Sequence, residues 1–504
     1  MSAEAGRRPF ARTGWLAGLA GIILALALPA APAAAQPASG EKLRQIDSEL
    51  GRYTIDPAGF MYGMTDGNVL PSNWIIQTRA GDGGAHLRAV HDLMMTAQSS
   101  IDITTLGPMP DGAYFDMLRD TLDALNREHR NLYVRILFGR YEDPRQNWNI
   151  ERLARELTDR LRHGTVNLAV AQIQTKTPAL SWNHSKIVTV DGARAIVGGH
   201  NFYSGDYVNN TPVFDLSMRI EGPAAISAQR YASKLWEYAC NYAKDGDPFW
   251  TTGAVAFPNA TDWLQRSVCM PFTPAALPPA TGTGLQVLAV SHAGIGWIPG
   301  MAAFGDIWQR GDTEQWSDMA RERAFQMAQR SIRISQQAIQ FPTWPYTMHD
   351  SVASDLAAAV MRGVDVYVVV SNSDAGLYSS KAPLSDTVDR IYQRIRGLPG
   401  ARDKMCGHFH LTTIAIGHGE RHWRTGAGIA NHAKFYMVDD SLFYIGSHNI
   451  YAPLASHAGT NQEFGFLIEN PQAAEQLLGE YWHPLWESSK IGAYIGDGRC
   501  PLPE

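Results

Sequence analysis

The chain has 504 residues, of which 45% are hydrophobic, and a formal net charge of −6. This length allows two or three ordinary domains, or one large duplicated domain, with a sizeable core. The acidic balance disfavours a nucleic-acid-binding protein, because such proteins usually present a basic surface to the phosphate backbone.

Residues 1–35 have the pattern of a secretory signal peptide. Three arginines precede an apolar run from Trp15 to Leu28, and Ala33–Ala35 provide a small-residue cleavage site. The alternative is a retained membrane anchor, which the shortness of the run and its end at Pro29 disfavour. The pair Arg7-Arg8 also fits a twin-arginine signal, so the export route stays open. We expect the mature protein to be secreted or periplasmic.

A strand-like stretch with the sequence WNHSKIVTVDG occupies positions 182–192. Its β-branched residues 187–190 are followed by Asp191-Gly192, which predicts a strand that ends in a turn. Alternate residues of a strand share a face, so we expect His184 and Lys186 side by side and Asp191 on the other face. One isolated pair of this kind is most often a solvated edge of a sheet, and alone it does not define a site.

The same motif recurs 248 residues later as NHAKFYMVDD at 431–440, with His432, Lys434 and Asp439 in equivalent positions. A glycine-containing turn follows each copy, so that Asn201 and Asn449 each lie 17 residues after a histidine. Two complete copies with equal spacing indicate an internal duplication.

Further matches extend the duplication. A carboxylate follows each histidine by 31 residues, as Asp215 and as Glu463, and upstream the stretch 97–103 matches 328–334. Each copy predicts helix, strand, helix, strand, loop, motif strand, turn, strand and helix. This alternation is typical of an α/β fold, a mixed sheet flanked by helices.

We therefore expect two similar α-β-α sandwich halves. Prolines and glycines between positions 270 and 284 mark a linker, which divides the chain after the signal peptide into an N-terminal repeat, 36–280, and a C-terminal repeat, 281–504. Packing of the halves with pseudo-two-fold symmetry would bring the two motif strands together at one active site between them.

The four cysteines form an even set, which in an exported protein favours two disulfides among three possible connectivities. We expect Cys240–Cys269 and Cys406–Cys500, one in each half. The chain contains no CxxC pair, so a thiolate zinc site is disfavoured.

A site at this meeting point would hold two imidazoles, two ammonium groups, two carboxamides and two carboxylates, a set that suits a phosphodiester. The lysines would neutralise the non-bridging oxygens, and the asparagines would donate further hydrogen bonds. One histidine would attack phosphorus while the other protonates the departing alkoxide. Asp215 and Glu463 would accept the second ring N–H groups. This chemistry requires no metal and no cofactor.

Simpler interpretations exist for several of these residues. The asparagines could be ordinary turn residues after glycine, and the carboxylates could be charges at strand ends, but their equal spacing in both copies favours the roles above. His418 and His422 have the i, i+4 spacing of metal ligands on a helix, yet the surrounding glycines favour a loop. The aromatic segments 296–308 and 341–346 could either enter a lipid interface or be buried between the halves.

The paired HxKxxxxD motifs, followed by GGHN and GSHN, resemble those of the phospholipase D superfamily. The stretches DLSMRIEGPAA at 215–225 and FYIGSHNIY at 443–451 are similar to secreted bacterial phospholipases D, and the resemblance spans most of residues 85–490. It implies that His184 forms a phosphohistidine and that His432 is the general acid. It also implies that the phosphate ligands are Lys186, Lys434, Asn201 and Asn449. Gly199 and Ser447 would lie at the substrate, and Asp191 and Asp439 would have a structural role.

The resemblance predicts a secreted phospholipase D that hydrolyses phosphatidylcholine-like lipids and transfers phosphatidyl groups to primary alcohols. Its partner would be a phospholipid membrane interface, with no nucleic acid, and the protein would be a monomer. The alternatives are a nuclease or another phosphodiesterase on the same fold, and a catalytically silent lipid-binding relative. The acidic charge disfavours the first, and the completeness of both motifs disfavours the second.

Overall fold

The computed structural model describes residues 40–53, 62–107, 109–139, 149–163, 165–175, 182–241, 250–257, 275–279, 281–292, 316–341, 346–451 and 461–503. The predicted signal peptide, parts of the predicted linker, the aromatic segment 296–308, most of 341–346 and the expected Cys240–Cys269 bridge lie outside the described residues. The Cys406–Cys500 bridge is confirmed, with a Cα–Cα distance of 5.3 Å. No helix within these ranges combines the length and apolarity needed to cross a membrane.

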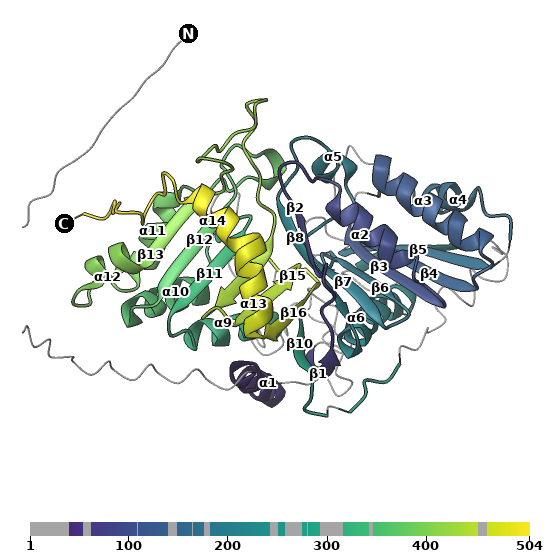
Figure 1. Ribbon diagram of the computed structural model, residues 1–504, viewed down its shortest axis with the longest axis horizontal. Helices are drawn as coiled ribbons and strands as arrows, with labels where there is room; N and C mark the ends of the chain where they lie inside the picture. Colours follow the sequence, from purple (N-terminus) through teal and green to yellow (C-terminus); the bar gives the residue numbers. More distant parts are fainter. Residues whose placement is uncertain are drawn as a thin grey trace, which may run out of the picture. The chain divides into compact units, whose positions relative to one another are not determined.

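The first half is built on an eight-stranded mixed sheet in the order β2-β8-β7-β6-β3-β4-β5-β9 (Figure 1). The central strands β3, β4 and β5 run parallel, and the remaining neighbours pair antiparallel. The strands are β2 (Ile75–Thr78), β3 (Ser100–Leu106), β4 (Leu132–Gly139), β5 (Val166–Thr175), β6 (Ile187–Val190), β7 (Arg194–Gly198), β8 (Asp215–Glu221) and β9 (Trp250–Phe257).

Helices cover both faces of this sheet because successive strand residues point to opposite sides. On β5, Leu168 and Val170 belong to the apolar cluster of α2, α3 and α4, whereas Ala169 and Ala171 belong to that of α6. The helices are α2 (Ala85–Met94), α3 (Gly112–Arg127), α4 (Ile150–Thr158), α5 (Ser204–Tyr207) and α6 (Pro223–Asn241).

The second half repeats this plan in a sheet of order β1-β10-β16-β15-β14-β11-β12-β13. Its strands are β1 (Tyr62–Asn68), β10 (Leu285–His292), β11 (Ser331–Gln336), β12 (Asp365–Val370), β13 (Phe409–Thr413), β14 (Lys434–Val438), β15 (Leu442–Gly446) and β16 (Glu463–Glu469). Its helices are α9 (Trp316–Gln326), α10 (Asp350–Arg362), η1 (Gly376–Tyr378), α11 (Leu384–Gln393), α12 (Ala401–His408), α13 (Pro471–Leu477), η3 (Leu478–Trp482) and α14 (His483–Ser489). The α/β fold of two helix-flanked sheets is thus confirmed.

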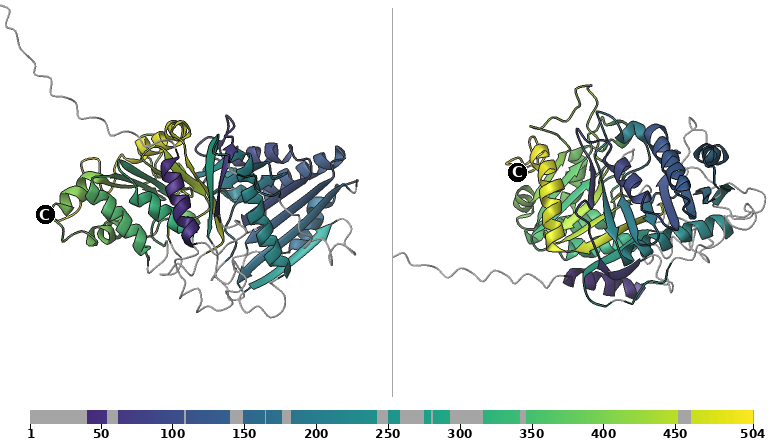
Figure 2. Two further views of the ribbon diagram at one scale, coloured as in Figure 1. Left: turned by 90° about the horizontal axis from the view of Figure 1, so that it is seen from below. Right: turned by 45° about the vertical axis from the view of Figure 1, so that its right-hand side comes forward.

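The two sheets meet through β7 and β8 on one side and β15 and β16 on the other (Figure 2). One apolar cluster continues across this junction, where the Tyr231 ring of α6 lies 5.0 Å from the Phe464 ring of β16. The motif strands β6 and β14 lie next to these junction strands, so both motifs face the region between the halves.

Two details of the predicted organisation differ from the structure. The predicted order omits elements between the preceding strand and the loop before each motif strand, namely α4 and β5 in the first half and α11, α12 and β13 in the second. In α4 the helical spacing of Ile150, Leu153 and Leu157 buries one face against the sheet. The early strand β1 pairs with β10, Tyr62 opposite Val290, so this part of the N-terminal repeat joins the second sheet.

The turn after each motif strand is held by its aspartate. Asp191 and Asp439 have φ angles of 56° and 52°, a left-handed conformation that aspartate tolerates in turns. The carboxylate of Asp191 accepts backbone N–H groups from Gln98, Ser99 and Ser100 at 2.7–2.9 Å. These contacts support the expected structural role of the motif aspartates.

Replacing Asp191 by alanine is expected to destabilise the protein by about 2–3 kcal/mol, because three backbone donors lose their acceptor. The loss is measured as the shift in denaturant midpoint at constant slope. Asp116→Ala, at an exposed position of α3, is the control, and an equally small effect of both substitutions would contradict the structural role of Asp191.

Candidate active site

Both motif histidines are held by backbone bonds to the other half. The N–H of His184 donates to the carbonyl of Gln462 at 2.9 Å, and the N–H of His432 donates to the carbonyl of Phe214 at 2.7 Å. Gln462 and Phe214 directly precede Glu463 and Asp215 in the sequence. Each histidine is therefore fixed beside the carboxylate of the opposite half.

The side chains complete this crossed arrangement. The Nδ1 atom of His184 lies 2.8 and 3.0 Å from the two carboxylate oxygens of Glu463. The Nδ1 atom of His432 lies 2.8 Å from Oδ2 of Asp215. When the carboxylate is ionised it can only accept, so each Nδ1 then carries the proton and leaves Nε2 for chemistry. The sequence predicted histidine–carboxylate pairs, and the structure assigns each pair to two different halves.

The motif lysines lie just inside the same site. Lys186 donates to the carbonyl oxygen of His184 at 2.6 Å, and Lys434 donates to that of His432 at 2.5 Å. His184 and Lys186 precede β6, whose first residue is Ile187, so the strand expected to carry them begins after them. Burial lowers the pKa of Lys186 to about 7 and that of Lys434 to about 8.

Burial also sets the protonation of the histidine–carboxylate pairs. It lowers the pKa of His184 and of His432 well below the usual value, and the nearby lysine charges act in the same direction. Burial raises the pKa of Glu463 to about 7 and that of Asp215 above its usual value. These shifts favour neutral imidazoles at neutral pH, and a neutral imidazole is the form that can attack phosphorus.

The turn residues near each histidine fall into two groups. Asn201 and Asn449 each have a buried side-chain Oδ1 with no hydrogen-bond partner in the described part of the chain. This oxygen is an acceptor, so the donation to a phosphate that the sequence predicts would come from Nδ2. Ser447 instead donates to Glu463 at 2.5 Å. At Gly199 a Cβ atom would lie 2.0 Å from Oδ1 of Asp215, so only glycine fits there. Gly199 and Ser447, which were expected at the substrate, thus lie against the carboxylates of Asp215 and Glu463.

Two tyrosines that sequence analysis missed belong to the site. The hydroxyl of Tyr207 donates to Asp215 at 2.8 Å. The ring of Tyr378 lies edge-on to His432, with centroids 4.8 Å apart, and its hydroxyl donates to Asp206 of α5 at 2.5 Å. Tyr207 lies six residues after Asn201 and could have been found from the motif, whereas Tyr378 comes from the unrelated turn η1.

The i, i+4 pair considered for metal binding, His418 and His422, does not lie on a helix, as the surrounding glycines predicted. His422 is exposed and pairs with Asp374 at 2.7 Å, and His418 lies in a turn. Among the described residues, the three side chains that gather with metal-ligand spacing are His292, Asp318 and His448.

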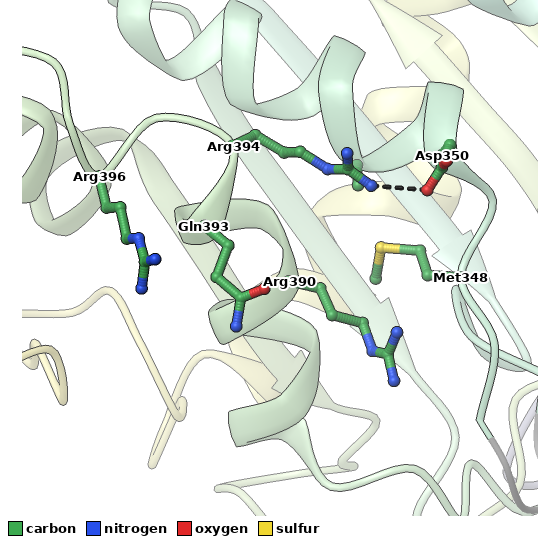
Figure 3. Close-up of a pocket in the computed structure, with 7 residues that line it drawn as sticks. Met348, Asp350, Arg390, Gln393, Arg394 and Arg396 are labelled. Atoms are coloured by element: carbon green, nitrogen blue, oxygen red, sulfur yellow. Dashed lines mark hydrogen bonds and ion pairs between the residues drawn. The ribbon is translucent and has the colours of Figure 1, made fainter.

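Away from the histidines, a pocket between the start of α10 and the end of α11 contains a cluster of arginines (Figure 3). Arg394 pairs with Asp350 at 2.6 Å, and Arg390 pairs with Asp386 at 2.9 Å. These ion pairs compensate most of the positive charge, and the pocket contains no histidine. Its carboxylate, Asp350, is held by Arg394, so the pocket lacks the pair of histidines on which the phosphodiester chemistry depends.

Comparisons with known proteins extend over both halves. Residues 322–486 match a family described as cardiolipin synthase, PLD-like domain. The chain is 32% identical over 502 residues to a phospholipase D from Streptomyces antibioticus, covering 88% of this chain and 86% of that protein. The crystal structure of a phosphatidylserine synthase from Haemophilus influenzae covers 88% of this chain and 90% of its own, with a TM-score of 0.54 and 13% identity. At that identity the structural match supports the shared fold alone.

Proposed function

The chain belongs to the phospholipase D superfamily, and on this basis we propose that it hydrolyses the distal phosphodiester bond of phosphatidylcholine-like glycerophospholipids. The observation that carries the proposal is the crossed pair of histidines, His184 on Glu463 and His432 on Asp215. A site with one proton donor and one nucleophile on opposite halves suits in-line displacement at phosphorus.

In the first step Nε2 of His184 attacks phosphorus, and the bond from phosphorus to the headgroup oxygen breaks. His432 transfers its proton to that oxygen, so the headgroup leaves as an alcohol and the phosphatidyl group stays on His184. The anionic substrate favours the protonated form of His432, which burial alone disfavours. Lys186 and Lys434 neutralise the charge on the non-bridging oxygens.

In the second step His432, now neutral, removes a proton from water. The hydroxide oxygen bonds to phosphorus, the bond to His184 breaks, and phosphatidate is released. Because the intermediate waits for a second nucleophile, a primary alcohol can replace water and yield a phosphatidyl alcohol. Glu463 and Asp215 hold the two rings in the required tautomers throughout.

The test is headgroup release from phosphatidylcholine vesicles with excess chelator and a few per cent of a primary alcohol, comparing the wild type with His184→Ala. The proposal expects released headgroup and a phosphatidyl alcohol, both abolished in the variant. Release without phosphatidyl alcohol would contradict the covalent intermediate. Absence of release would contradict the lipid substrate and favour another phosphodiester, nucleic acid included. The predicted export signal and action at a membrane interface belong to this proposal.

Activity is expected to depend on pH with a bell shape. The rising limb reflects loss of a proton from the nucleophilic histidine and lies below pH 6.5, because burial lowers the pKa of His184. A lysine with a lowered pKa is charged below that value, so phosphate binding weakens as pH rises through about 7 for Lys186 and about 8 for Lys434. The measurement is kcat/KM from pH 4 to 10 with a soluble phosphodiester.

Lys186→Arg distinguishes the origin of the falling limb, because a guanidinium keeps its charge across this range. Whatever activity the variant retains should fall at higher pH than in the wild type. An unchanged falling limb would assign it to the general acid alone.

A further inference from the structure

A buried cluster lies in the second half, on residues that the phosphodiester chemistry does not use. His292 ends β10, Asp318 lies in the first turn of α9, and His448 lies in the turn after β15. Oδ2 of Asp318 is 3.4 Å from Nε2 of His292 and 3.9 Å from Nε2 of His448. The two imidazole centroids are 4.8 Å apart.

Contacts on the outer side of the cluster fix the direction in which each donor atom points. Nδ1 of His292 lies 2.9 Å from the carbonyl oxygen of Asn461, and a carbonyl can only accept, so Nδ1 carries the proton. In the neutral ring the Nε2 lone pair therefore points toward Asp318. Nδ1 of His448 lies 2.6 Å from the hydroxyl of Ser317. The second oxygen of Asp318 binds Arg321 at 2.5 Å. Outer partners of this kind orient the ligands of metal sites.

The spacing within the cluster matches a metal ion better than direct hydrogen bonds. Both Nε2–Oδ2 distances exceed the usual hydrogen-bond range of about 2.7–3.2 Å. Two ligands of a tetrahedral zinc ion with bonds of about 2.0–2.1 Å lie about 3.3 Å apart. The side chain of His448 is 10% exposed, which leaves the cluster a route from solvent.

The first half shows what the same position looks like without a metal-ligand set. Thr78 of β2 lies opposite Asp215, just as His292 of β10 lies opposite Glu463. His200 in the first turn corresponds to His448 in the second. There the Thr78 hydroxyl and Nε2 of His200 form a direct hydrogen bond of 2.6 Å. The second half replaces this closed contact with two imidazoles and a carboxylate at wider spacing.

We propose that His292, Asp318 and His448 bind a first-row divalent metal ion, with Zn²⁺ as the best match to two imidazoles and one carboxylate. The ion has a structural role: it joins β10, α9 and the turn that contains Ser447, whose hydroxyl holds Glu463. It takes no part in the transfer of the phosphatidyl group, so the proposal does not depend on the lipid activity.

The test uses the full-length purified protein, stripped with a strong chelator and then titrated with Zn²⁺. Bound metal is measured by mass spectrometry and calorimetry, and stability by thermal unfolding. We expect one equivalent of Zn²⁺ and a higher unfolding temperature. His292→Gln and His448→Gln should each weaken binding by at least about tenfold, because a ligand is lost. These variants avoid Asp318→Asn, which would leave buried Arg321 without its carboxylate.

The matched controls are His408→Gln and His422→Gln, which replace histidines paired with Asp365 and Asp374 nearer the surface of the same half. Both should bind Zn²⁺ as the wild type does. Absence of stoichiometric binding in the wild type would overturn the proposal and assign the cluster to a proton shared between His292 and Asp318. Loss of binding in a control variant but not in His448→Gln would overturn it in favour of a surface site.

Discussion

His184→Ala is expected to lower turnover by at least about 10⁴-fold with every substrate, because no other group can form the covalent intermediate. His432→Ala should behave differently. With a choline ester, whose alkoxide needs a proton to leave, its kcat/KM should fall by about 10²–10⁴-fold. With a p-nitrophenyl phosphodiester, whose leaving group needs no proton, most of this loss should disappear. The measurement is kcat/KM of both variants for both esters.

The comparison is informative because both histidines are equally buried and equally held by a carboxylate, so their environments do not assign the roles. His422→Ala, in an exposed ion pair, is the control for a histidine change in the second half. If the activated ester rescues His184→Ala and not His432→Ala, the nucleophile is His432. If it rescues neither variant, the general-acid role itself is wrong.

The duplicated motif made much of this site predictable. The repeated HxK spacing predicted that His184 and Lys186, like His432 and Lys434, share one site. The strand geometry behind that prediction was only partly right, because His184, Lys186 and His432 precede the strands β6 and β14. Repeated α/β alternation gave the two sheets. These inferences succeed because they depend on residues close together in the sequence, where backbone geometry alone fixes which side chains are neighbours.

The crossed pairing could not be predicted, because it depends on how the two halves pack. Within the sequence Asp215 is closer to His184, yet β8 directs its carboxylate to His432 across the junction. Other features share this origin. Tyr378 reaches His432 from η1, and β1 crosses to the second sheet. His292 and Asp318 meet His448 although long segments separate them, so no fixed spacing reveals their cluster.

Glu463→Gln should therefore reproduce the loss of activity of His184→Ala, and Asp215→Asn should reproduce that of His432→Ala. An amide keeps the shape of the carboxylate but cannot stabilise the imidazolium or hold the productive tautomer, and a comparable change in a serine protease costs about 10⁴-fold. We expect Glu463→Gln to lose about 10²–10⁴-fold with both the choline ester and the p-nitrophenyl ester. Asp215→Asn should lose a similar factor with the choline ester and recover most of it with the activated ester.

Each strand supplies its own control. Glu221 ends β8 six residues after Asp215, and Glu469 ends β16 six residues after Glu463. Glu221→Gln and Glu469→Gln each remove one negative charge from the same strand as the test variant. Both positions lie away from the histidines, so both variants should retain wild-type kcat/KM. Pairing within each half would give the opposite pattern, with Asp215→Asn inactive on both esters and Glu463→Gln rescued. Because the two arrangements predict reversed substrate dependence, one set of four variants decides whether the halves depend on each other for catalysis.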